Sequence, residues 1–148
     1  MGDGRSVVLF DYNRDGLTDI ASINTNAPKL VLFRNELPSK NNFAVFRLLG
    51  ANQTGRKSDK NSNRDAYGAR LTLKVGDLTI TEELRAGEGF SAQNSRTLLI
   101  GLGEAKSIDS ATVFWPSGRV QKFSNLPARQ LMILREGDEA VLSAPYSR

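Results

Sequence analysis

The chain has 148 residues and a formal net charge of +4, and it contains neither histidine nor cysteine. Without cysteine it can form no disulfide, thiol nucleophile or thiolate zinc site, and without histidine it has no imidazole base or imidazole metal ligand. Any bound metal must therefore be held by oxygen atoms, which favours calcium or magnesium. No apolar run approaches the roughly 18 residues that cross a bilayer, so we expect no membrane insertion.

Short apolar or alternating runs, separated by turn residues, follow one another along the chain and predict an all-β fold. The first cluster comprises residues 6–10, 20–23 and 29–33. The run 43–49 is apolar on both faces apart from Arg47 and is expected to be a central strand. Further strands are predicted at 69–75, 78–80, 97–100, 111–115, 119–123 and 130–134. About nine short strands with tight turns favour an antiparallel β-sandwich preceded by an N-terminal β-hairpin.

One long stretch breaks this regular spacing. Residues 50–66 are polar and poor in apolar side chains, which predicts a long surface loop. The densest positive charge of the chain lies within it, at 56–64, but acidic and neutral residues are interspersed there. We therefore expect a solvated, protease-sensitive loop and no nucleic-acid partner.

The residues with the clearest chemistry lie between the first two predicted strands. Residues 11–19 read Asp-Tyr-Asn-Arg-Asp-Gly-Leu-Thr-Asp, so oxygen-bearing side chains occupy alternate positions of a turn that a glycine allows to bend sharply. Carboxylates gathered at one point repel one another unless a cation lies among them. We predict a calcium site here, with a metal-free Asx-rich turn as the alternative. The predicted ligands are the side chains of Asp11, Asn13, Asp15 and Asp19 and the backbone carbonyl of Leu17.

An EF-hand has similar ligand spacing, but it needs a glutamate where this chain has Ser22, and it needs helices on both sides. The flanking segments here are strand-like. This strand–loop–strand arrangement resembles the FG-GAP (VCBS-type) repeat, the blade unit of integrin-like β-propellers. Residues 1–40 hold one copy, so the resemblance implies the last blade of a longer propeller, with upstream propeller-like repeats as partners.

The remainder of the chain is similar to the ASPIC/UnbV domain, which follows such repeats in cartilage acidic protein-like proteins. The similarity rests on four ordered motifs, at residues 63–70, 85–95, 99–103 and 113–118. The expected organisation is then a repeat at 1–40, a β-sandwich at 41–137 and a tail at 138–148. The resemblance also implies an extracellular, cell-surface or periplasmic location.

Three classes of function follow from these observations. We expect a non-catalytic calcium-binding module that mediates interaction or adhesion, with a protein or glycan ligand. Alternatively, Trp115 and Tyr67 with nearby arginines would form a carbohydrate-binding module for glycans such as acidic polysaccharide, although Trp115 also suits a core position. An enzyme would have to use carboxylates alone, for instance Glu88 and Asp109, and this class is the least favoured.

Overall fold

The computed structural model describes residues 3–52 and 58–147, and every regular element within these ranges is a β-strand. The strands are β1 (Gly4–Phe10), β2 (Asp19–Asn24), β3 (Leu30–Phe33), β4 (Asn42–Leu49), β5 (Arg70–Val75), β6 (Leu78–Glu83), β7 (Thr97–Gly103), β8 (Ser107–Phe114), β9 (Val120–Pro127), β10 (Gln130–Arg135) and β11 (Leu142–Pro145). They form three sheets with mostly antiparallel pairing, which confirms the predicted all-β class. In the described part of the chain, no helix is long and apolar enough to span a membrane.

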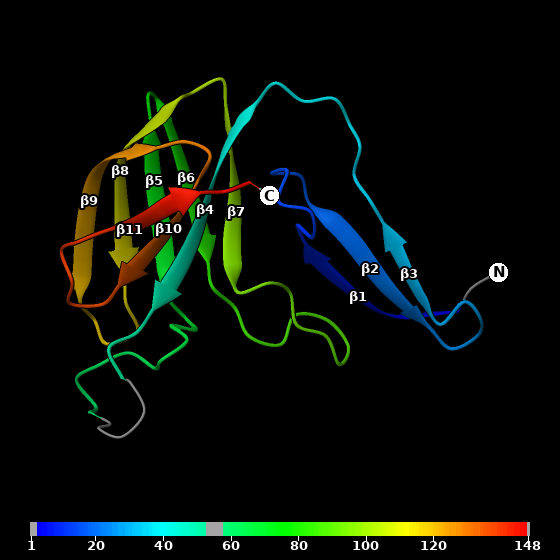
Figure 1. The fold of residues 1–148 in the computed structure, drawn as a ribbon. Helices are drawn as coiled ribbons and strands as arrows, with labels where there is room; N and C mark the ends of the chain where they lie inside the picture. The colour runs from blue at the N-terminus through cyan, green and yellow to red at the C-terminus, as the bar shows by residue number, and fades with distance from the viewer. Residues whose placement is uncertain (1–2, 53–57, 148) are drawn as a thin grey trace.

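Strands β1, β2 and β3 form a sheet of their own, which lies to one side of the other two sheets (Figure 1). The predicted hairpin of β1 and β2 is present, and β3 extends it into a three-stranded antiparallel meander. The register places Leu9 opposite Ile20 and Ile20 opposite Phe33, so these side chains share one face. Each of them is between 39% and 55% exposed. The meander therefore presents an uncovered apolar row.

The other eight strands form two four-stranded sheets that enclose one core, with the orders β11-β10-β4-β7 and β6-β5-β8-β9. In β5, Leu71 and Leu73 are fully buried whereas Arg70 and Lys74 are exposed, which is the alternation that the sequence predicts. Burying each large apolar side chain stabilises the fold by about 1.5–3 kcal/mol. The core includes Phe46, Leu48, Leu71, Leu73, Ile108, Val113, Met132 and Leu134.

Strand β10 has two neighbours that the sequence did not predict. On one side it runs parallel to β4, with Leu131 opposite Val45. The prediction of a purely antiparallel sandwich was therefore wrong for this pair of strands. On the other side it pairs with β11, which lies in the segment 138–148 that we expected to be a tail. All four residues of β11 are exposed, so no apolar alternation marks the strand in the sequence. Its backbone hydrogen bonds cover an edge of β10 that would otherwise be unpaired.

The predicted long loop is anchored in its described parts, residues 50–52 and 58–66. Ser62 is only 2% exposed, and its N–H donates to the Glu136 carboxylate at 2.8 Å. The Asn52 amide donates to the carbonyls of Ser58 and Asn61 at 2.9 and 3.0 Å. These contacts hold the segment against the end of β10, which differs from the expectation of a freely solvated loop. Residues 53–57, which include part of the predicted cleavage region, lie outside the described residues.

Candidate functional site

The loop between β1 and β2 turns tightly around the carboxylate of Asp11. Oδ1 of Asp11 accepts the N–H of Asp15 at 3.2 Å, and Oδ2 accepts the N–H of Gly16 at 2.8 Å. The Asn13 amide donates to Asp15 Oδ2 at 2.7 Å. Gly16 has φ +86°, a conformation that a residue without Cβ adopts freely. The loop therefore joins two strands as predicted and brings three of the predicted ligand residues together.

Asp19, the predicted closing ligand, lies at the start of β2 and is completely buried. Its Oδ2 accepts the N–H of Tyr12 at 3.0 Å, and its Oδ1 accepts the N–H of Asn35 at 2.8 Å. Each carboxylate oxygen is thus hydrogen-bonded to backbone, and Asp19 ties the loop to the segment that follows β3. Within residues 3–52 and 58–147, no group of three or more acidic side chains is close enough to hold a metal ion.

The loop packs directly on the sandwich through Gly16. A Cβ at this position would lie 2.1 Å from the Phe43 ring, so the ring touches the loop backbone. On its other sides the Phe43 ring is contacted by the edge of Tyr146, at 6.0 Å between centroids, and by the Arg129 guanidinium, 5.4 Å from the ring centroid. Contacts of these kinds each contribute about 0.5–1.5 kcal/mol. Phe43 is therefore the centre of the contact between the meander and the sandwich.

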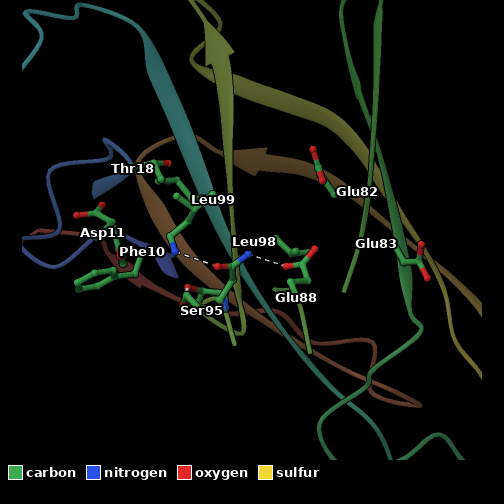
Figure 2. A pocket seen from close by; sticks show the side chains of 13 residues that line it. Phe10, Asp11, Thr18, Glu82, Glu83, Glu88, Ser95, Leu98 and Leu99 are labelled. Carbon is green, nitrogen blue, oxygen red and sulfur yellow. Dashed lines mark hydrogen bonds between the residues drawn. The ribbon is translucent and has the colours of Figure 1, made fainter. Parts of the chain in front are cut away.

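A second contact is made between β1 and the segment that precedes β7. The N–H of Leu9 donates to Asn94 Oδ1 at 2.9 Å, and the carbonyl of Leu9 accepts the N–H of Ser95 at 3.2 Å. The Asn94 amide nitrogen donates in turn to Glu88 Oε2 at 2.8 Å. Figure 2 marks the two side-chain hydrogen bonds with dashed lines. Asn94 thus connects the backbone of the meander to the Glu88 carboxylate.

A cavity of about 230 Å³ lies beside this contact. In Figure 2, Glu88 lies between Asp11 on one side and Glu82 and Glu83 on the other, and all four carboxylates line the cavity. Burial raises the pKa of Asp11, and backbone hydrogen bonds lower it only in part. Burial also raises the pKa of the Tyr146 hydroxyl, which lines the same cavity. The site is rich in oxygen and negatively charged, so its chemistry suits a cation or a hydrogen-bond donor.

The residues considered for other functions lie elsewhere. Trp115 is 3% exposed and belongs to the core, so it forms no platform for a sugar ring, and Tyr67 packs partly buried against the same core. Asp109 accepts the N–H of Gly76 at 2.8 Å and thereby closes the turn between β5 and β6. Glu88 lines the cavity, and Asp109 is not among its lining residues.

Sequence reasoning missed the residues that join the two parts of the chain. Asn94 lies within the motif 85–95, but nothing in that motif says that its amide would reach β1. Tyr146 lies in the segment expected to be a tail, and Phe43 was expected only as an apolar strand residue. Their roles depend on contacts between residues 27 to 103 positions apart in sequence: Gly16 with Phe43, Leu9 with Asn94 and Phe43 with Tyr146.

Comparison with known families matches residues 59–141, more than half of the chain, to the family described as ASPIC and UnbV. The comparison detects no FG-GAP repeat. No curated protein matches the chain. The matched range includes strands β5 to β10 and excludes the meander, the loop between β1 and β2, β4 and β11.

Proposed function

The chain belongs to the ASPIC/UnbV family, and from that premise we propose that it is a non-catalytic, calcium-binding β module of a larger secreted or cell-surface protein that mediates interaction or adhesion. The observation that carries the proposal is the contact of the loop around Asp11 with Phe43 of the sandwich. A cation in this loop stiffens the turn and, through Gly16, its contact with the sandwich. Calcium is the proposed cofactor because it is abundant outside cells and prefers oxygen ligands.

The oxygen donors of the loop are of the types that calcium prefers. Asp11 and Asp15 supply carboxylate oxygens, and both accept hydrogen bonds within the same turn. In the structure the amide nitrogen of Asn13 donates to the Asp15 carboxylate. Rotation of the amide group by half a turn would exchange its nitrogen and oxygen, so that the oxygen faces the side of Asp15 where the ion would bind. Each oxygen of Asp19 retains a lone pair after its backbone hydrogen bond. The residues that would hold the ion are Asp11, Asn13, Asp15 and Asp19, with the Leu17 carbonyl.

The meander is the proposed surface for upstream propeller-like repeats. One face carries Leu9, Ile20 and Phe33, and the opposite face carries Ile23 and Leu30, which are 53% and 67% exposed. A sheet that faces water on one side normally alternates apolar with polar residues, whereas a sheet covered on both sides is apolar on both. The two apolar faces therefore support a blade that packs between neighbouring sheets.

Calcium binding is tested by melting temperature and titration calorimetry on the full chain. Calcium at about 100 times Kd stabilises the folded state by about 2.7 kcal/mol, which raises the melting temperature by several degrees. Magnesium raises it less, because its small octahedral shell fits a multi-carboxylate loop poorly. Asp15→Ala removes the calcium-dependent rise.

The matched control is Asp77→Ala, which removes the same charge from the exposed turn between β5 and β6. This variant retains the full calcium-dependent rise. The proposal fails if the wild-type melting temperature is the same in chelator and in about 10 mM calcium and calorimetry detects no binding heat.

A further inference from the structure

Four arginines meet on the sandwich, away from the loop around Asp11. A cavity of about 330 Å³ is lined by Arg47, Leu49, Arg64, Asp65, Arg96 and Arg135. Four positive side chains and one negative side chain leave three positive charges in the lining. Like charges at this density repel one another and lower the stability of the folded chain. A negatively charged ligand in the cavity would offset this repulsion.

The sheet order explains how these side chains come together. Arg47 is exposed on β4 between Phe46 and Leu48, which point into the core, so the alternation of the strand directs Arg47 outwards. Arg135 on the parallel neighbour β10 lies opposite Leu49, two residues further along β4 and on the same outer face. The parallel pairing of β4 with β10 thus places the two arginines on one face of the sheet, offset by two residues along the strands.

The other two arginines lie on two different segments that neighbour β4. On the antiparallel neighbour β7, Thr97 lies opposite Arg47, and Arg96 immediately precedes it. The carbonyl of Arg64 accepts the N–H of Gly50 at 3.0 Å, which holds Arg64 at the end of β4. Arg47 and Arg135 are therefore positioned by strand pairing, whereas Arg64 and Arg96 are held next to β4 by the contacts of the segments that carry them.

The acidic groups nearby position this cluster without neutralising it. Asp65 contacts Arg96 at 2.7 Å and Arg64 at 3.1 Å, which holds both guanidinium groups at the cavity. Arg135 lies 3.7 Å from Asp138, which does not line the cavity. Among the residues that the structure describes, Arg47 forms no ion pair. The guanidinium of Arg47 therefore retains its donors for a ligand.

We propose that this cavity, the arginine pocket, binds a tetrahedral, doubly negative oxyanion of the phosphate monoester class. Guanidinium groups present parallel N–H donors that match the oxygens of such a group. The excess positive charge of the lining, only partly offset by Asp65 and Asp138, favours a dianion over a carboxylate, which carries a single charge. No aromatic side chain is among the described residues that line the pocket, so neither base stacking nor sugar stacking contributes, and the oxyanion is the recognised element.

The probes are inorganic phosphate, glucose 6-phosphate and acetate, titrated into the full chain at constant ionic strength and followed by calorimetry. Phosphate binds at millimolar concentration or tighter, and acetate binds at least roughly tenfold more weakly. Glucose 6-phosphate distinguishes the source of the anion. Tighter binding than inorganic phosphate indicates a phosphorylated sugar as the ligand, and equal binding indicates that the free anion suffices.

The variants Arg47→Gln and Arg135→Gln each weaken phosphate binding by roughly tenfold. The matched control is Arg34→Gln, which removes the same charge from an exposed arginine beyond β3 that pairs with Glu36. This control changes the affinity less than about twofold. Both pocket arginines are exposed, so we expect the variants to fold, and an unchanged melting temperature verifies it.

Two results overturn the proposal: no phosphate binding up to about 10 mM, or equal weakening by the pocket variants and the control. The second result would show that phosphate responds only to net charge. The proposal does not depend on calcium, since none of the loop residues lines the pocket. Phosphate binding in the presence of chelator therefore tests it separately from the proposed function.

Discussion

The carboxylate of Glu136 accepts a hydrogen bond from the backbone N–H of Ser62 at 2.8 Å, across 74 residues of sequence. The same oxygen accepts the N–H of Ala51 at 2.9 Å, and the other oxygen accepts the hydroxyl of Ser117. Glu136 is only 3% exposed. One buried carboxylate thus joins the end of β4, the segment 58–66 and the turn between β8 and β9.

Glu136→Ala lowers the free energy of unfolding by about 2–4 kcal/mol, because it leaves the buried N–H of Ser62 without an acceptor. Glu139→Ala is the matched control, since Glu139 is exposed three residues further on, and it changes stability by less than about 0.5 kcal/mol. Urea denaturation measures both. Equal stability of the two variants would contradict the structural role of Glu136.

The contribution of Glu136 to stability depends on pH. Burial raises the pKa of its carboxyl, but hydrogen bonds from Ser117, Ala51 and Ser62 outweigh burial and hold the pKa below the usual 4.5. Since the folded pKa lies below the unfolded one, the stabilisation is complete above about pH 4.5 and is lost as pH falls through the folded pKa.

The pH effect is measured as the difference in unfolding free energy between the wild type and Glu136→Gln. This difference is largest near neutral pH and decreases below pH 4.5, the ordinary value of the carboxyl. Asp11 has a raised pKa, so its effect on the pH dependence of stability has the opposite sign to that of Glu136. Because Asp11 is present in both proteins, its effect cancels in the difference. A difference that stays constant from pH 7 to about pH 3 would exclude the proposed linkage.

Gly16→Ala disrupts the contact between the meander and the sandwich, because the added methyl group would meet the Phe43 ring. Gly118→Ala is the control: Gly118 has φ +87°, close to the +86° of Gly16, but a Cβ there meets nothing within 4 Å. Backbone strain costs about 1–3 kcal/mol in either variant. Gly16→Ala lowers the free energy of unfolding by roughly 1–3 kcal/mol more than Gly118→Ala does. In NMR spectra, the resonances of Tyr146 change position in Gly16→Ala but not in Gly118→Ala.

Asp19→Ala destabilises the meander whether or not calcium is present. It removes the acceptor for the N–H groups of Tyr12 and Asn35, which costs about 2–4 kcal/mol. In chelator, Asp15→Ala has a smaller effect, since Asp15 is exposed. Hydrogen exchange of the β1–β3 amides in chelator measures the difference. Equal protection in the two variants would show that Asp19 acts only as a ligand residue.

Local sequence patterns predicted much of the fold because the side chains of a strand alternate between two faces. The alternation of Leu71 and Leu73 with Arg70 and Lys74 placed β5 and its buried face correctly. The spacing of residues 11–19 predicted a tight loop between two strands, and the structure contains one. The edge strand β11 could not be predicted, because its four exposed residues show no apolar alternation. Its extended conformation depends on backbone hydrogen bonds to β10, which the local sequence does not reveal.

By itself the sequence determined the all-β class, most strand positions, and the resemblance of the sandwich to its family, because each is encoded in neighbouring residues. Only the tertiary structure decided what the polar side chains contact. Asp19 binds backbone N–H groups, Glu136 joins three distant segments, and Arg47 and Arg135 line one cavity because β4 and β10 are parallel neighbours. Alternation says which face a residue occupies, but sheet order brings distant segments together, and that order is set by burial of the whole core.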